Sequence, residues 1–234
     1  MKKLFEKIKE IKKMPRGNAI LFFGFYFVFF LIVFLLLNTG SGKPITSNDY
    51  KINKAYSFNT NYLQENNYSF DYTISLDDIK YKYSGKRNGD VSSFNFNERK
   101  YYSNKDNYLV YQDTWIKSDN PFVVDEMFVN ANEIIKLIEL AAYESKTEYD
   151  SGKKIYNFLI STNTINQYIY NINSDFFEEP NRIIISTDEN NSVSSITLNL
   201  DSFCTLNKQC QKNLRVELLF DNFGNIEEIE SPII

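Results

Sequence analysis

The hydrophobic and polar positions change their pattern several times along the chain. Residues 19–37 read AILFFGFYFVFFLIVFLLL, in which sixteen of nineteen residues are Ile, Leu, Val or Phe and none is charged. At about 1.5 Å per residue this run makes a helix about 28 Å long, close to the hydrocarbon thickness of a bilayer. The run therefore predicts a single transmembrane helix over Ala19–Leu37.

From residue 68 onward the pattern alternates with a period of two, which is typical of half-buried strands. The apolar residues of Tyr68–Leu76 alternate with Ser, Asp and Thr, and Asn88-Gly89 predicts a hairpin turn ahead of Phe94 and Phe96. Further strands are predicted at Ile79–Tyr83, Tyr101–Tyr102, Asn107–Tyr111, Thr114–Lys117, Lys146–Tyr149, Lys154–Ser161, Arg182–Thr187, Ser192–Leu200, Leu214–Asp221 and Ile226–Glu230.

Two segments return to a helical period. Asn130 followed by Glu133 resembles a capping box, and a helix over Asn132–Tyr143 is predicted to carry an apolar stripe. The stripe consists of Ile134, Leu137, Ile138 and Ala141. A second short helix is predicted near Thr164–Ile172. Because strands outnumber helices and most turns are short, we expect an α+β fold with a mainly antiparallel sheet.

These patterns divide the chain into four parts. Residues 1–18 are expected to form a basic amphipathic cytoplasmic tail, and residues 19–37 the transmembrane helix. Residues 38–53 are rich in Gly, Ser, Pro and Asn and are expected to form a flexible linker that reaches about 20–25 Å. Residues 54–234 are expected to form one β-rich domain outside the cytoplasm, long enough to bury a sizeable core.

Charge supports this topology. The tail carries seven cations against two glutamates, and few Lys or Arg follow the apolar run closely, which predicts a cytoplasmic N-terminus. The cations either set the topology alone or also hold the tail on anionic headgroups: Lys2, Lys3, Lys7, Lys9, Lys12, Lys13 and Arg16. Because the whole chain carries −4 and the tail +5, the remaining residues carry −9, which argues against nucleic-acid binding.

A cleaved signal peptide is the alternative interpretation of residues 19–37. Its apolar core would be longer than the usual stretch of about 7–15 residues, and no A-x-A cleavage site follows. We therefore expect an uncleaved anchor, and a location in the cell membrane with the C-terminal domain outside the cytoplasm.

Candidate chemistry is sparse. The chain has no histidine, which removes the commonest general base and metal ligand, and we expect no metal and no cofactor. Cys204 and Cys210 are the only cysteines, and a pair this close outside the cytoplasm is expected to form a disulfide. A redox pair or a metal site is the alternative, but no C-x-x-C motif supports it.

Aromatic and acidic residues each allow a functional interpretation. Tyr108, Tyr111 and Trp115 either line a ligand or glycan surface or belong to the core of a small sheet. Carboxylates are frequent, and a pair of them in a cleft could act as acid and base in glycoside cleavage, or all could simply be solvated. They include Asp77, Asp78, Glu178, Glu179, Glu227, Glu228 and Glu230. We expect no catalytic residue among them and therefore no enzyme.

The order of elements resembles a known family. A meander ending in NYLVYQDTWIK, the helix NEIIKLIELAAY, the hairpin KTEYDSGKKIYNFLIS, a second helix and a final run of strands resemble the LolA/LppX-like lipoproteins. The resemblance covers about Tyr68–Pro232 and implies a half-barrel, an incomplete antiparallel barrel whose concave face is covered by one or two helices. Members of that family hold lipid or acyl chains between sheet and helices. Here a membrane helix replaces the lipid-modified cysteine.

The resemblance leads to two hypotheses about function. The first is a membrane-anchored domain that binds a lipid or other apolar ligand in a sheet–helix cavity. The second is a non-catalytic structural or protein-interaction domain of the cell envelope with a filled core and an envelope protein as its partner. The candidate cavity residues are Phe70, Tyr72, Ile74, Trp115, Ile134, Leu137, Ile138 and Ala141.

Overall fold

The computed structural model describes residues 56–105 and 107–233, which belong to the compact unit Tyr50–Ile234. The predicted basic tail, transmembrane helix and linker, residues 1–53, lie outside the described residues. Within the described ranges, no helix is both long enough and apolar enough to span a bilayer.

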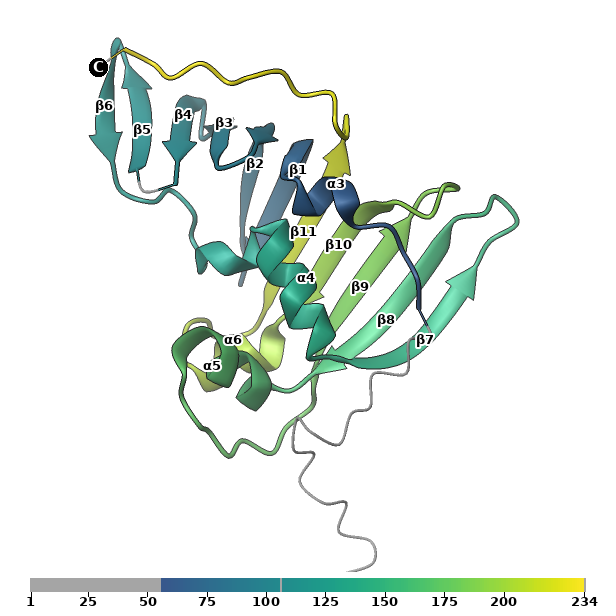
Figure 1. The fold of residues 1–234 in the computed structure, drawn as a ribbon. Helices are drawn as coiled ribbons and strands as arrows, with labels where there is room; N and C mark the ends of the chain where they lie inside the picture. The colour runs from purple at the N-terminus through teal and green to yellow at the C-terminus, as the bar shows by residue number, and fades with distance from the viewer. Residues whose placement is uncertain (1–55, 106, 234) are drawn as a thin grey trace, which may run out of the picture. The chain divides into compact units, whose positions relative to one another are not determined.

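A single antiparallel sheet of eleven strands dominates the described chain (Figure 1). Its order is β6-β5-β4-β3-β2-β1-β11-β10-β9-β8-β7. The strands are β1 (Asn67–Leu76), β2 (Ile79–Asn88), β3 (Val91–Phe96), β4 (Arg99–Asn104), β5 (Asn107–Gln112), β6 (Thr114–Ser118), β7 (Ala142–Glu148), β8 (Lys154–Ile160), β9 (Asn181–Thr187), β10 (Val193–Asn199) and β11 (Leu214–Asp221). The expected open antiparallel α+β sheet is thereby confirmed.

The strand order explains why one segment must cross the sheet. The first six strands add outward from β1 to the edge strand β6, whereas the next strand in sequence, β7, lies at the opposite edge. The chain between them therefore has to pass over one face of the sheet. It does so through the 3₁₀ helix η1 (Glu126–Phe128) and helix α4 (Ala131–Glu139), and we call the covered face the inner face (Figure 1).

Three further helices accompany the sheet. Helix α3 (Asn61–Gln64) lies next to α4, while α5 (Thr162–Tyr170) and α6 (Asp201–Leu206) lie together at one end of the sheet (Figure 1). Asn130 is the N-cap of α4, and its side-chain oxygen accepts a hydrogen bond from the Asn132 backbone N–H at 3.1 Å, as the sequence predicts.

The core lies between the inner face and these helices. The alternating residues of β1 face inward and pair with inward residues of β11, for example Phe70 with Phe220 and Tyr72 with Leu218. Ile134, Leu137 and Ile138 of α4 are almost fully buried against this layer. The predicted apolar stripe is therefore confirmed up to Ile138.

The predicted ends of two helices and one predicted strand are wrong. Helix α4 ends at Glu139, because Ala142–Glu148 pairs with β8 as strand β7 and leaves Ala141 in the connection. Helix α5 ends at Tyr170, so Ile172 is exposed. Residues 226–230 form no strand, because the side chains of Asn67 and Asn88 bind the Ile226 backbone instead, with distances of 2.9–3.0 Å.

Candidate functional site

The candidate site lies on the inner face of β1–β5, beneath the segment that leaves the edge strand β6. We call residues 119–130 the cover segment; it contains η1 and ends at the N-cap of α4. Outside η1 it has no regular secondary structure, whereas the face below it is lined by aromatic side chains. The site therefore combines a floor of regular strands with an irregular roof.

The floor and the roof are held together mainly by aromatic packing. The Phe122 ring stacks on Phe94 of β3 with a centroid distance of 5.4 Å, and it lies 4.8 Å from the ring of Tyr83 on β2. The Tyr83 hydroxyl donates a hydrogen bond to the Pro121 carbonyl oxygen at 3.1 Å. Phe122 thus packs, half-buried, on the aromatic inner face.

Seven of the eight predicted cavity residues share one core. Phe70, Tyr72, Ile74, Ile134, Leu137 and Ile138 are buried there, and the half-buried Ala141 packs against them. Trp115 does not join them. Its ring centroid lies 5.5 Å from that of Tyr111 and 6.5 Å from that of Tyr102, on the face of the sheet opposite the inner face. The strand register therefore separates Trp115 from the other seven residues.

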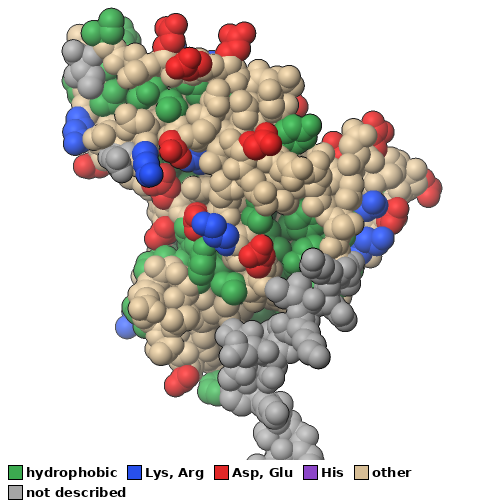
Figure 2. Space-filling view, viewed as in Figure 1, with side chains coloured by type: hydrophobic (Ala, Val, Ile, Leu, Met, Phe, Trp, Pro, Cys, Tyr) green, Lys and Arg blue, Asp and Glu red, His purple; other side chains and the backbone are tan. Residues whose placement is uncertain are grey.

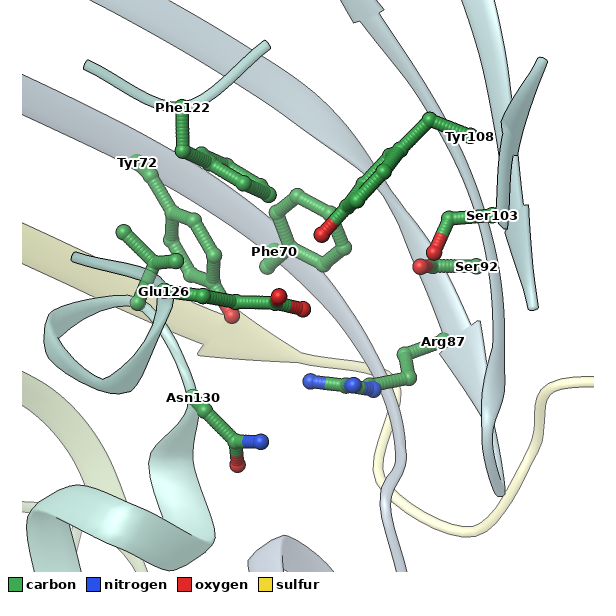
Figure 3. Close-up of a pocket in the computed structure, with 10 residues that line it drawn as sticks. Phe70, Tyr72, Arg87, Ser92, Ser103, Tyr108, Phe122, Glu126 and Asn130 are labelled. Atoms are coloured by element: carbon green, nitrogen blue, oxygen red, sulfur yellow. The ribbon is translucent and has the colours of Figure 1, made fainter. Parts of the chain in front are cut away.

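A small polar pocket interrupts this apolar layer. It encloses about 20 Å³, enough for about one water molecule, between β1–β5 and the cover segment. Figure 3 shows the guanidinium of Arg87, the hydroxyl of Tyr108 and the carboxylate of Glu126 pointing into the same space. The pocket is lined by Phe70, Tyr72, Arg87, Ser92, Ser103, Tyr108, Phe122, Glu126, Val129 and Asn130.

Two buried polar atoms, one on a residue that lines the pocket and one on its neighbour in the sheet, lack a hydrogen-bond partner among the described residues. They are the Nε of Arg87 and the hydroxyl of Tyr68, two residues that are paired directly across β1 and β2. Tyr68 is fully buried, and no ion pair within 4.0 Å reaches Arg87 in the described part of the chain. Leaving such groups unpaired costs about 1–3 kcal/mol each, so the site holds unused hydrogen-bonding capacity.

The surrounding phenols remain hydrogen-bond donors. Burial raises the pKa of the Tyr72 phenol well above its usual value, and the neighbouring Tyr68 adds to that rise. Burial and then the facing Glu126 carboxylate raise the pKa of the Tyr108 phenol. Both hydroxyls are therefore protonated at neutral pH, and the only anionic group that lines the pocket is Glu126.

A larger, open groove of about 650 Å³ lies at β1–β3 on the other side of the sheet. Outward-facing side chains of both charges border it, including Asp71, Lys80, Lys82 and Glu98. This mixture suits solvent rather than an apolar ligand. In Figure 2, apolar side chains on the side covered by α4 are likewise interspersed with acidic and basic ones.

The other predicted chemistry is structural where the described residues show it. Cys204 and Cys210 form the expected disulfide, with Cα atoms 5.4 Å apart, although Cys204 lies in helix α6 rather than in a loop. Asp77 accepts hydrogen bonds from the backbone N–H groups of Gln211 and Lys212 at 2.7–3.1 Å. The carboxylates at 178–179 and 227–230 are exposed. The tail cations lie outside the described residues.

Arg87 is the main site residue that the sequence analysis missed. Counting in steps of two from Tyr81 and Tyr83 through Gly85 places Arg87 on the inward face of β2. A cation in phase with aromatic residues was therefore the available signal. The cover segment gave no such signal, because its apolar residues follow neither the helical nor the strand period.

Comparisons with known proteins give weak similarities only. No protein-family model matches the sequence, and no curated protein matches it. Among solved structures, LprF from Mycobacterium bovis is similar with a TM-score of 0.41 and 7% identity, over 74% of this chain and 96% of that one. The Mycobacterium tuberculosis lipoprotein LppX has a TM-score of 0.38 and 8% identity, over 74% and 100%.

Proposed function

We propose that this protein is a membrane-tethered, non-catalytic binding domain that holds an apolar chain, such as an acyl chain, between the inner face and the cover segment. The observation that carries the proposal is the position of Phe122. An aromatic side chain from an irregular segment packs on the aromatic face of the sheet, where a regular helix would have given a fixed roof.

The roof is suited to opening. The cover segment is irregular on either side of η1 and is attached to β2 and β3 through the Phe122 ring and the Tyr83 hydrogen bond. Segments with few backbone hydrogen bonds open at a lower free energy than strands or helices. Because the enclosed space is about 20 Å³, an acyl chain enters only when Phe122 moves out and leaves its place on Phe94 and Tyr83.

The predicted tether supplies the context. An uncleaved helix over residues 19–37 and a linker of 16 residues would keep the domain within about 20–25 Å of the extracytoplasmic face of the membrane that the helix spans. At that distance the inner face is close to a source of acyl chains. In this proposal the basic tail remains on the cytoplasmic side.

Native mass spectrometry of the full-length chain in a mild neutral detergent tests the proposal. We expect a bound lipid or fatty acid to be retained, and Phe122→Ala to raise the occupied fraction at least twofold. Phe177→Ala is the matched control, because Phe177 is 91% exposed, and it should leave occupancy unchanged. No bound mass in any of the three proteins, even after incubation with palmitate, would refute the proposal.

A second function is favoured by one specific observation. Ile74, Ile134 and Leu137 have no exposed surface, so this part of the core is already filled. A filled core fits a structural or protein-interaction domain of the envelope. Co-purification of an envelope protein with the full-length chain but not with a chain that lacks residues 54–234, together with the absence of a ligand, would favour this alternative.

A further inference from the structure

We infer that the polar pocket is an anion site, and that the ligand of the proposed function is an amphiphile with one carboxylate or phosphate group bound by Arg87. For the apolar chain of the ligand, the inference rests on the proposed function. For the anionic group of the ligand, it rests on separate observations. Those observations are the donors that converge on the pocket, the two unpartnered buried atoms and the position of Glu126.

The pocket brings together one guanidinium and several hydroxyl groups that can donate hydrogen bonds, and its one carboxylate comes from the cover segment. A guanidinium carries five N–H donors, and the hydroxyls of Tyr72 and Tyr108 are held protonated by burial. Ser92 and Ser103 lie side by side at the same wall (Figure 3). A wholly hydrocarbon ligand would leave these groups unpaired, whereas a carboxylate or phosphate accepts several donors at once.

The unpartnered atoms favour an anion rather than a purely apolar group beside Arg87. Arg87 is fixed on the inner face by its place in β2, opposite the fully buried Tyr68 of β1. The Nε of Arg87 and the hydroxyl of Tyr68 have no hydrogen-bond partner among the described residues. An anion at the guanidinium would engage Nε directly, and this gives the site a spectroscopic marker.

Glu126 occupies the position of a competing anion. It lies on η1, within the cover segment, and its carboxylate points toward the same space as Arg87 and Tyr108 (Figure 3). Glu126 is exposed, and it forms no ion pair within 4.0 Å of Arg87 in the described part of the chain. A ligand anion would therefore take its place beside Arg87 as the cover segment moves out.

The test uses the full-length chain, labelled with ¹⁵N-arginine, in neutral maltoside micelles. The probes are octanoate, octan-1-ol and inorganic phosphate. We expect octanoate to shift one arginine Nε–H signal that is absent from the Arg87→Lys spectrum, and octan-1-ol to leave that signal in place. Octanoate affinity should fall at least tenfold in Arg87→Gln and less than twofold in Arg99→Gln, which removes an exposed arginine from β4.

Arg87→Lys provides a second variant that keeps the charge, and it should bind octanoate with intermediate affinity because it lacks the planar fork. Glu126→Gln should raise octanoate affinity at least threefold. A shift of the Arg87 signal with inorganic phosphate would identify free anions as a ligand source, and a shift with octanoate alone would identify lipid headgroups. Both outcomes support an anion at Arg87.

Other outcomes separate this inference from the proposed function. Equal binding of octanoate and octan-1-ol by the wild-type chain and Arg87→Gln would overturn the anion site and leave apolar binding intact. A phosphate-induced shift without binding of either chain probe would support the anion site and count against the proposed function. Octanoate binding that moves no arginine Nε–H signal would also overturn the anion site.

Discussion

Phe122 stacks on Phe94 with ring planes 21° apart, although one residue lies in an irregular segment and the other in the middle of a strand. The contact exists because the chain must travel from the edge strand β6 to the opposite edge strand β7. The route over the inner face brings an apolar side chain onto an aromatic floor. The path of the cover segment is thus a consequence of the strand order, and the same route gives the site its irregular wall.

The hydrogen bond from Tyr83 to Pro121 should hold the cover segment closed. Tyr83→Phe keeps the ring packing and removes the donor, so closure should weaken by about 1 kcal/mol. Hydrogen exchange of the backbone amides in residues 122–129 should become several-fold faster. Tyr81→Phe on the same strand is the control. Equal exchange rates in both variants would show that the Tyr83–Pro121 hydrogen bond does not hold the cover segment closed.

Leu137 should be the most sensitive part of the helix layer. It has no exposed surface, so Leu137→Ala leaves a cavity and should lower the free energy of unfolding by about 2–5 kcal/mol. Leu140, three residues later at the C-cap of α4, is 40% exposed, and Leu140→Ala should cost less than about 1 kcal/mol. Urea unfolding followed by circular dichroism measures both values, and equal losses would contradict the assigned packing of α4.

Asp77 should make stability depend on pH at the acidic end. Backbone N–H groups of Gln211 and then Lys212 hold the pKa of its carboxyl below the ordinary value of 3.8. A lowered pKa in the folded state means that the stabilisation is present above pH 3.8 and is lost as the pH falls through the lowered value. Asp77→Ala should therefore reduce the urea midpoint at neutral pH, and the difference from wild type should shrink well below pH 3.8. A constant difference would contradict this assignment.

The disulfide should stabilise the turn between α6 and β11. Cys204 and Cys210 are six residues apart, and closing so small a loop contributes about 2 kcal/mol in the chain-entropy model. The double variant Cys204→Ala/Cys210→Ala should lose about this much stability, measured by urea unfolding without reductant. Thiol labelling of protein taken directly from cells provides the second check, because two reactive thiols would contradict a location outside the cytoplasm.

The sequence predicts those parts of the fold that have a period. Alternation over Tyr68–Leu76 identifies β1 and its inward face, and the spacing of Ile134, Leu137 and Ile138 identifies α4. The end of α4 could not be predicted, because pairing of Ala142–Glu148 with β8 overrides the local helical pattern. Strand order across the sheet is also a non-local property. Without the strand order, the crossing of the cover segment over the inner face cannot be predicted.

The candidate site was predictable only in part. The apolar floor follows from alternation, and seven of the eight predicted residues share one core. Trp115 could not be assigned to a face, because β6 is short and both of its faces carry apolar residues. Arg87 follows the alternation of β2. The polar pocket also needs Glu126 and Tyr108, which only the folded chain brings near Arg87.

Mapping where an acyl chain contacts the protein tests the central claim most directly. The full-length chain in neutral micelles would be irradiated with a palmitate analogue that carries a diazirine on its chain, and the labelled peptides identified by mass spectrometry. The account predicts labels in β1 within residues 67–76 and in the cover segment within residues 119–130, both reduced by an excess of unmodified palmitate. Labels confined to residues 19–37, or labels in the domain that palmitate does not reduce, would contradict it.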